Sequence, residues 1–365
     1  MQGVLYREKW GSPRTIYMGG GTPSLLPIGL LAKILQAIAD VFGDAADREF
    51  TVECNPGTVD AAKLRALRAG GVNRLSFGVQ TFDDTLLKKI GRIHTGAQAR
   101  EAMALARTAG FQNVSMDLIY GLPGESLAEL ERDLEAMVAL EPEHISIYGL
   151  QLEEGTAFAK MQEMGRLMLP DDDTVERMYD TMTAFLPAHG YARYEISNFA
   201  KPGFESRHNL SYWQDVPYLG VGAAAHSYLE GQRYENVQEI PAYIEGIRTG
   251  KGVRRQEETM TREIGELQHL EVLEGFDDAI LVHRGGGPVS LPLHLVTSGA
   301  HSYADAGVDQ HGEIVFSVAE GHALLHGDAE VLQNGVHALV FPMPNDTEPV
   351  RTRGIRIQRF VKQHK

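Results

Sequence analysis

The chain has 365 residues, 43% of them hydrophobic, and a formal net charge of −15. Its length predicts two or three domains at about 150 residues each, and its apolar content suffices for a large core. The negative charge argues against nucleic acid or an anionic membrane as the main partner, because both are bound chiefly through Lys and Arg. No apolar run approaches the ~18 residues of a membrane span, and no signal peptide is recognisable. We therefore expect a cytoplasmic protein.

Cys54 is the single cysteine. One thiol excludes an intramolecular disulfide framework and a metal site built only from cysteines of this chain. In its strand-like segment, Cys54 shares the apolar face with Val52. This placement favours a buried structural thiol over a nucleophile.

Strand-like and helix-like segments alternate through the first part of the chain. The expected strands are Thr15–Gly19, Glu49–Asn55, Arg74–Gln80, Asn113–Tyr120 and His144–Leu150. The expected helices between them are Gly29–Phe42, Ala61–Ala69, Asp84–Ile90, Ala97–Ala109 and Leu127–Leu140. Such alternation predicts βαβ units and a parallel sheet.

Within these strands one face is apolar and the other is polar or small. In Arg74–Gln80, for example, Leu75, Phe77 and Val79 alternate with polar or small residues. A doubly wound sheet, covered on both faces, would have nearly continuous apolar strands. The alternation instead favours a closed or partly closed β/α barrel with helices outside and a ligand in the lumen.

The segment Thr15–Pro23 reads as a strand that runs into three glycines, a threonine and a proline. Glycines let a backbone approach a ligand closely and present its N–H groups. The loop has neither the Lys-Ser/Thr of a P-loop nor the spacing of a dinucleotide-binding motif. It lies at the carboxyl end of a strand, where α/β folds bind ligands.

Polar side chains end several of these strands. They are Glu53, Gln80 and Asp117, joined by Arg92 on the segment after Gln80. A carboxylate beside backbone N–H groups and an arginine suits a zwitterionic amino acid moiety, and Asp117 suits ribose hydroxyls. The alternative is an internal hydrogen-bond network that only fills a barrel. The residues alone leave both readings open.

The chain continues with an expected helix at Asp171–Pro187, a strand-like Tyr191–Ser197, a small-residue run at Leu219–His226 and a helix at Pro241–Thr249. Four aromatic or imidazole side chains of this region could offer an axial ligand and an apolar wall to a porphyrin. They are His208, Tyr212, Trp213 and His226. A hydrogen-bonded histidine beside core aromatics explains them equally simply, and without further context it is the preferred reading.

Several motifs nevertheless occur together in a known family. They are Gly-Gly-Gly-Thr-Pro-Ser (19–24), Glu-Cys-Asn-Pro-Gly (53–57), Arg-Leu-Ser-Phe-Gly-Val-Gln-Thr-Phe (74–82), Gly-Arg-Ile-His (91–94) and Met-Asp-Leu-Ile-Tyr-Gly-Leu-Pro-Gly (116–124). Over residues 1–263 the chain resembles the radical S-adenosylmethionine (SAM) family of oxygen-independent coproporphyrinogen III oxidases and their relatives. Tyr-Glu-Ile-Ser-Asn-Phe-Ala (194–200) and His-Asn-Leu-Ser-Tyr-Trp (208–213) are similar to its heme-chaperone branch.

The resemblance implies a partial (β/α)6 barrel that binds S-adenosyl-L-methionine and a [4Fe–4S] cluster. By residue-to-residue match, Gly20, Gly21 and Thr22 would hold the methionine part and Glu53 its amino group. The remaining cofactor contacts would be Gln80, Arg92 and Asp117. In the heme-chaperone branch heme is the cargo, heme-accepting apo-proteins are the partners, and His208 is the candidate heme contact.

Two departures from the family accompany this resemblance. The family's cluster cysteines lie on the loop after the first barrel strand, and we expect this chain to begin beyond that strand. We therefore expect no SAM cleavage by this chain. After about Arg262 a Gly- and His-rich tail replaces the family's helical domain. The expected regions are an incomplete barrel (1–165), a heme- or porphyrin-related region (166–263) and a divergent tail (264–365).

A heme chaperone is the leading functional hypothesis. The alternatives are an oxygen-independent coproporphyrinogen III oxidase of porphyrin biosynthesis and an inactive fragment without a cluster. The sequence makes no prediction of the heme recipient or of the oligomeric state.

Overall fold

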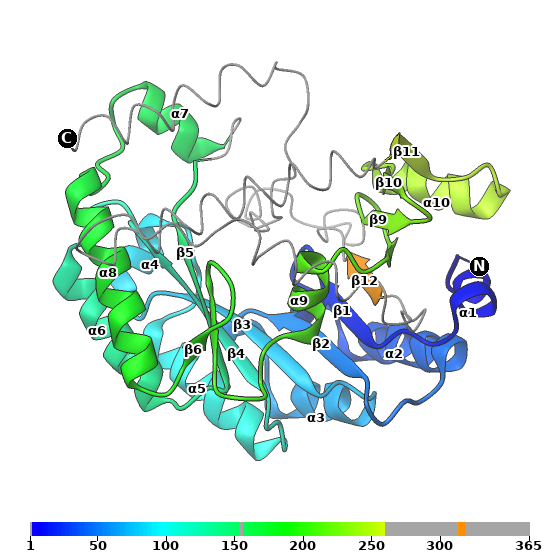
Figure 1. The fold of residues 1–365 in the computed structure, drawn as a ribbon, viewed down its shortest axis with the longest axis horizontal. Coiled ribbons are helices and arrows are strands. Elements are labelled where there is room, and N and C mark those ends of the chain that lie inside the picture. Colours follow the sequence, from blue (N-terminus) through cyan, green and yellow to red (C-terminus); the bar gives the residue numbers. More distant parts are fainter. Residues whose placement is uncertain (1, 153–155, 260–312, 318–365) are drawn as a thin grey trace, which may run out of the picture.

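The computed structural model describes residues 2–152, 156–259 and 313–317. One curved sheet runs through these ranges, in the strand order β11-β10-β9-β8-β12-β1-β2-β3-β4-β5-β7-β6 (Figure 1). Its central part, from β8 through β12 and β1 to β5, is parallel. Antiparallel strands extend both edges.

The parallel strands are β1 (Thr15–Gly19), β2 (Glu49–Cys54), β3 (Arg74–Gln80), β4 (Val114–Tyr120), β5 (His144–Gly149), β8 (Tyr218–Val221) and β12 (Glu313–Ser317). The antiparallel additions are β6 (Ala192–Arg193), β7 (Asn198–Ala200), β9 (His226–Leu229), β10 (Gln232–Asn236) and β11 (Arg254–Thr259). The strands expected around residues 15–150 are confirmed, with ends that differ by a residue at most.

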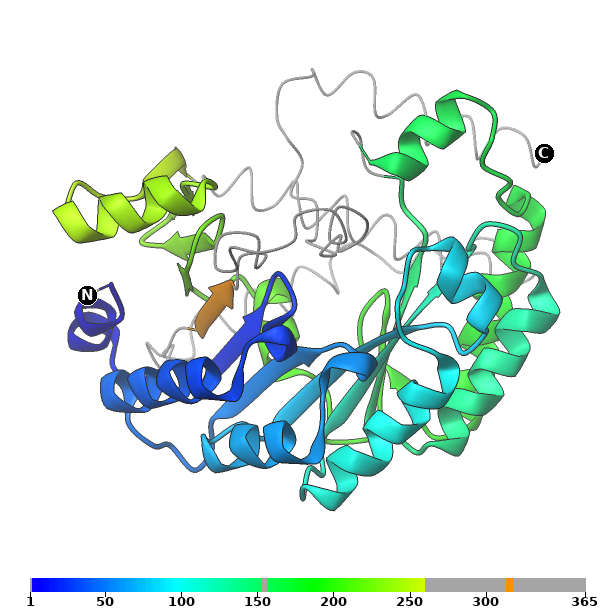
Figure 2. The same ribbon diagram turned by 180° about the vertical axis from the view of Figure 1, so that it is seen from behind.

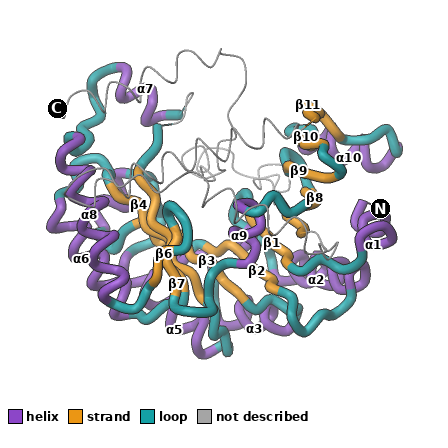
Figure 3. The backbone as a smooth tube through the Cα atoms, viewed as in Figure 1, coloured by secondary structure: helices purple, strands orange, loops and turns teal. Residues whose placement is uncertain are grey.

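The α-helices are α1 (Gln2–Trp10), α2 (Ile28–Phe42), α3 (Ala61–Ala69), α4 (Asp84–Lys89), α5 (Gly96–Thr108), α6 (Leu127–Ala139), α7 (Ala157–Glu163), α8 (Asp172–Ala188), α9 (Arg207–Trp213) and α10 (Ile240–Thr249). Short 3-10 turns cover Pro23–Leu25 and Pro56–Thr58. Helices α2, α3, α5, α6 and α8 follow one another along the outside of the curved sheet, as seen from both sides (Figures 1 and 2). Figure 3 shows the strands lying inside this arc.

Side-chain caps fix where several of these helices begin. Thr95 and Gln98 form a reciprocal capping box at the start of α5, and Ser126 and Glu129 form another at α6. Each box satisfies N–H groups that the first turn of a helix leaves without an internal acceptor. These caps therefore fix the first residues of α5 and α6.

The hydrophobic core lies between the sheet and its outer helices. Ile16, Val52 and Phe77 point outward from their strands and are buried against helical residues such as Leu31 and Leu64. Cys54 belongs to the same cluster and is 3% exposed, which confirms the prediction of a buried thiol. The polar faces of the strands are left to line the concave side. A partial β/α barrel, rather than a doubly wound sheet, is thus confirmed.

The structure corrects one element. The single strand expected at Tyr191–Ser197 is wrong, because the chain there forms β6, a bend and the antiparallel β7. Glu195 lies in the bend and accepts a hydrogen bond from the Ser197 N–H at 3.1 Å, which closes a local turn. Side chain-to-backbone bonds of this kind compete with an extended strand.

The regional boundaries at residues 165 and 263 stay predictions. Of the expected tail (264–365), the structure describes only β12, which lies between β8 and β1. The remainder of that region is outside the described residues. Within the part of the chain that is described, no helix has the length and apolar character needed to cross a membrane.

Two glycines near helix starts test the packing of the barrel wall. A β-carbon at Gly96 would lie 2.3 Å from the carbonyl oxygen of Phe82, whereas one at Gly29 would contact nothing within 4 Å. We expect Gly96→Ala to destabilise the fold by about 2 kcal/mol through overpacking. Gly29→Ala should stabilise it by roughly 0.5 kcal/mol, because alanine loses less backbone entropy in a helix.

Urea unfolding of both variants measures these effects. Equal transition midpoints for Gly96→Ala and the parent chain would contradict the packing of α5 against the segment after β3.

Candidate functional site

The glycine loop, Glu53 and Gln80 lie at the carboxyl ends of β1, β2 and β3, the functional end of β/α barrels. The glycine loop leaves β1 at Gly19, and Gly20 has a positive φ of 92°. Glu53 follows on the neighbouring β2, with which β1 pairs in parallel. The loop and the carboxylate therefore meet at the carboxyl ends of the strands.

Glu53 is held through both oxygens of its carboxylate. The Tyr17 hydroxyl donates to Oε1 at 2.6 Å, and the Gly20 N–H donates to Oε2 at 3.1 Å. A β-carbon on Gly19 would lie 2.6 Å from Cδ of Glu53 and 2.6 Å from Cε1 of Tyr17. Residue 19 therefore has to be glycine if the carboxylate and the tyrosine ring are to lie here.

Burial raises the pKa of Glu53 from 4.5 to about 7, and the negative charge of Asp117 adds to this rise. The hydrogen bonds from Tyr17 and Gly20 oppose it without cancelling it. None of the ion pairs among the described residues includes Glu53. A half-buried carboxylate that forms no ion pair within the described part of the chain is well suited to receive the positive charge of a ligand.

Thr22 and Arg92 are joined through Asn55. The Asn55 side chain donates to Oγ1 of Thr22 at 3.1 Å and accepts from an Arg92 guanidinium nitrogen at 3.4 Å. The hydroxyl of Ser24 accepts from the Asn55 N–H at 3.1 Å. Burial lowers the pKa of Arg92, and the charge of Asp117 opposes that change. Asn55 thereby connects the loop after β1 with the segment after α4.

Gln80 has a strained backbone and an unsatisfied side chain. Its φ is +70°, and a bulge between Gly78 and Gln80 breaks the alternation of β3. Its side-chain Oε1 is buried without a hydrogen-bond partner. A β-carbon on Gly78 would lie 2.9 Å from Nε2 of Gln80, so the amide occupies space that a larger residue would fill. Strain together with an orphaned acceptor is typical of a ligand site.

Asp117 lies deeper, near the middle of β4 and level with Gly78. The hydroxyls of Ser76 and Ser115 each donate to it at 3.3 Å. Burial raises its pKa to about 6, against the effect of its hydrogen bonds to serine and the charge of Arg74. Part of the predicted set therefore belongs to an internal hydrogen-bond network, as the alternative reading had it.

These residues fit a SAM-like ligand better than they fit an iron–sulfur cluster. Among the described residues, the Glu53 carboxylate has no ion-pair partner and Oε1 of Gln80 has no hydrogen-bond donor. Together with the glycine loop, these two groups suit an amino acid moiety. A cluster needs several thiolates, whereas Cys54 is the single cysteine, is buried, and has a pKa raised by burial to about 12. Within the described residues, no group of three or more His, Cys, Asp or Glu could hold a metal ion.

His208 lies away from these residues, near the amino end of β1, where it contacts Thr15. It is 2% exposed, and its ring nitrogens are hydrogen-bonded to the hydroxyls of Thr15, at 2.8 Å, and Tyr212, at 3.0 Å. Tyr212 is 37% exposed, so Nε2 of His208 is on the side nearer to solvent. Binding of heme iron at this nitrogen would require the Tyr212 hydroxyl to move. The heme contact stays a prediction.

Sequence reasoning did not name Tyr17 and Asn55 among the site residues. Strand alternation offered the signal for both. Tyr17 shares a face of β1 with Thr15 and Gly19, and Asn55 continues the polar face of Glu53. Tyr17 bonds to Glu53, and Asn55 bonds to Thr22 and Arg92. These partners depend on the register of neighbouring strands, which the sequence does not give.

This chain is similar in sequence to known proteins. The family model of the radical SAM superfamily matches residues 2–137. The chain is 46% identical over 242 residues to the heme chaperone HemW of Bacillus subtilis, a match that covers 66% of this chain and 64% of that protein. It is 43% identical over 243 residues to the heme chaperone HemW of Lactococcus lactis, covering 67% of this chain and 64% of the relative.

The chain thus spans 64% of the length of these two curated relatives. Among solved structures, the coproporphyrinogen III oxidase HemN of Escherichia coli superposes with a TM-score of 0.62. That match has 22% sequence identity and covers 72% of this chain and 64% of the other. At this identity the superposition shows the shared fold.

The raised pKa of Glu53 makes a prediction for stability. A folded-state pKa of about 7, above the ordinary 4.5, means that the folded chain holds this proton more tightly than the unfolded chain. Glu53 therefore costs stability as the pH rises from 4.5 through 7. We expect Glu53→Gln to raise the melting temperature of the ligand-free protein at pH 8 by about 2–4 °C, and to change it little at pH 5.

Thermal unfolding of both chains at the two pH values checks this. An equal difference at pH 5 and pH 8 would mean that Glu53 does not titrate in this range.

Proposed function

We propose that this chain, which belongs to the radical SAM superfamily through residues 2–137, binds S-adenosylmethionine and serves as a heme chaperone. The ligand site would lie at the carboxyl ends of β1 to β4. Heme would be the cargo and apo-proteins its recipients. The proposal includes a cytoplasmic location, which suits a chain whose single cysteine is a free thiol.

The Glu53 carboxylate is the observation that supports SAM binding. It is half-buried, has no partner among the ion pairs of the described residues, and lies against the backbone of the glycine loop. The ammonium group of the ligand's methionine part would pair with Glu53. The backbone N–H groups of Gly21 and Thr22, beside Gly20, would face its carboxylate.

The remaining predicted residues complete the site in this proposal. Arg92 and the unsatisfied Oε1 of Gln80 would contact the ligand above β3, where Asn55 orients the guanidinium. Asp117 would accept from ribose hydroxyls in place of one of its serine donors. These residues account for binding of SAM. The residues of this chain do not provide the thiolates of a [4Fe–4S] cluster. For this chain we therefore propose binding of SAM and no cleavage of it.

The heme function is supported by sequence similarity to proteins named as heme chaperones. His208 is the proposed heme contact within this chain. Its Nε2 would have to exchange the hydrogen bond with Tyr212 for the iron, which makes the contact dependent on a local rearrangement of α9.

Titration with SAM tests the ligand site. We expect Glu53→Gln to weaken binding about 10- to 100-fold, because a charge-assisted bond to a half-buried carboxylate is lost. The exposed Glu101 on α5 offers the matched control, Glu101→Gln, which should bind as the parent chain does.

The same measurement has an expected pH dependence. Only the ionised carboxylate attracts an ammonium group, so affinity should be constant above pH 7 and should fall toward tenfold per unit below it. If affinity were independent of pH between 5 and 8, and Glu53→Gln bound normally, Glu53 would not be the ammonium partner.

Hemin titration followed by visible absorption tests the chaperone proposal separately. We expect saturable binding by the full chain and loss of the bound-hemin spectrum in His208→Ala. His189→Ala, which removes an exposed histidine at the end of α8, is the control. Failure of the full chain to bind hemin would count against the heme function, while equal binding by His208→Ala would count against His208 alone.

A further inference from the structure

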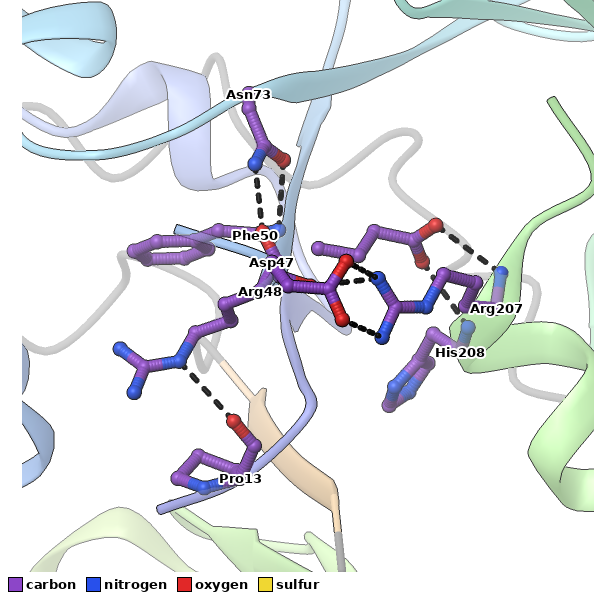
Figure 4. Close-up of polar contacts among 8 residues, drawn as sticks. Pro13, Asp47, Arg48, Phe50, Asn73, Arg207 and His208 are labelled. Atoms are coloured by element: carbon purple, nitrogen blue, oxygen red, sulfur yellow. Dashed lines mark hydrogen bonds and ion pairs between the residues drawn. The ribbon is translucent and has the colours of Figure 1, made fainter. Parts of the chain in front are cut away.

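Helix α9 is fastened to the amino end of β2 by acidic side chains. The carboxylate of Glu49 accepts from the backbone N–H groups of Arg207 and His208, both at 3.0 Å. The Arg207 guanidinium also pairs with Asp47 at 3.2 Å (Figure 4). Backbone N–H groups at a helix start have no acceptor inside the helix, so Glu49 both satisfies them and fixes the position of α9.

The segment that carries these acids is itself anchored. The buried Arg48 donates to the carbonyl of Pro13 at 3.1 Å and to the carbonyls at the end of α2. Asn73 accepts from the Phe50 N–H at 2.8 Å and donates to the Arg48 carbonyl at 2.6 Å (Figure 4). Residues 47–50 are therefore held by the residues just before β1 and β3 and by the end of α2, which gives α9 a fixed base.

From this base His208 projects onto β1. A hydrogen bond of 2.8 Å joins its Nδ1 to the Thr15 hydroxyl, and its ring stacks on Tyr17 with centroids 4.9 Å apart and planes inclined by 15°. Tyr212, one turn along α9, holds the other ring nitrogen. The imidazole is therefore fixed both in its plane and along its stacking axis.

The stacked Tyr17 in turn reaches Glu53. Its hydroxyl donates to Oε1 at 2.6 Å, while the Gly20 N–H binds Oε2. With one donor on each oxygen, the plane of the carboxylate is determined by the tyrosine and the loop together. A continuous series of contacts thus runs from Glu49 through His208 and Tyr17 to the site at the other end of the strands.

We propose that His208 and Tyr17 are positioning residues of the SAM site, which orient the Glu53 carboxylate toward the ligand's ammonium group. This inference rests on the proposed function and deepens it. It makes α9, from the region after the barrel, a support of the ligand site. It also gives His208 a role that needs no iron.

A ligand-free measurement tests the support directly. In protein labelled with carbon-13 at the glutamate carboxyl carbons, the Glu53 signal is identified by its loss in Glu53→Gln, and its titration is followed by NMR. Tyr17→Phe removes the donor to the carboxylate, so we expect the Glu53 pKa to rise by about one unit. Tyr191→Phe removes a buried hydroxyl that, among the described residues, bonds to the Pro142 carbonyl. It lies beside β6, at an edge of the sheet and away from β2, which carries Glu53, and should leave the titration unchanged.

Two substitutions at His208 distinguish its stacking on Tyr17 from its proposed binding of heme iron. His208→Phe keeps a ring against Tyr17, whereas His208→Ala removes it. We expect the Glu53 pKa to rise in both variants, because both lose the imidazole charge that lowers it, and to rise more in His208→Ala, which also leaves the Tyr17 ring without its stacking partner. If His208 had a role in iron binding alone, both variants would lose hemin binding equally and would shift the Glu53 titration by the same amount.

SAM binding then links the support to the ligand. We expect Tyr17→Phe to bind about tenfold more weakly, with the midpoint of its pH dependence moved to higher pH by the same shift seen in the ligand-free protein. His208→Ala should be weakened about threefold and His208→Phe little. A merely structural role would lower stability without moving this midpoint.

The outcomes distinguish the two proposals. If Glu53 titrates normally in Tyr17→Phe and His208→Ala, the positioning inference is overturned, even where the parent chain binds SAM. If the titration shifts as expected but no chain binds SAM, the positioning contacts are real and the proposed ligand is wrong.

Discussion

The site depends on the Glu53 carboxylate, which is half-buried and takes part in none of the ion pairs among the described residues. A carboxylate in such surroundings is costly, and the fold lowers the cost with two donors, one from Tyr17 and one from the Gly20 N–H. Both donors require close approach, which only a glycine at position 19 permits. The glycine loop, the tyrosine and the carboxylate are therefore one unit, and none of them can be exchanged without disturbing the others.

The Glu53 carboxylate lowers the stability of the ligand-free fold at neutral pH but suits the binding of a cationic ligand. The pKa of about 7 shows that burial outweighs the hydrogen bonds, so the ligand-free fold loses stability at neutral pH. A cationic ligand would recover that loss on binding. Gln80, with its positive φ and unsatisfied oxygen, has the same character. Sites prepared for a ligand commonly retain local strain or unsatisfied groups that the surrounding fold has to support.

Much of the barrel and of the site could be predicted from sequence, because apolar and polar residues alternate along each strand and so show which face points to the helices. The bounds of β1 to β5, the outward-facing Cys54 and the shared edge of Glu53 and the glycine loop all follow from a period of two residues. The prediction fails where alternation fails. A bulge before Gln80 inserts an extra residue into β3, and a turn at Glu195 divides an apparently continuous strand.

Contacts between distant segments were beyond sequence reasoning for a different reason. From the residues alone, a hydrogen-bonded histidine beside aromatic residues is the preferred reading of His208, and the family resemblance makes it a candidate heme contact. An imidazole in such a setting has no fixed role until its neighbours are known. Its partners, Thr15 and Tyr17, are nearly two hundred residues earlier in the chain. Nothing local encodes that pairing; it follows from Glu49 capping α9 on a base held by Arg48 and Asn73.

This docking bears on how the chain is organised. The predicted boundary at residue 165 would separate the barrel strands from α9 in sequence, yet Glu49 at the start of β2 holds α9 against β1. A change in the position of α9, such as the release of Tyr212 from His208 that heme binding there would require, would reach Tyr17 and then Glu53. Heme and SAM would then be linked through two stacked rings, and any affinity that one ligand lost through this contact would be lost equally by the other.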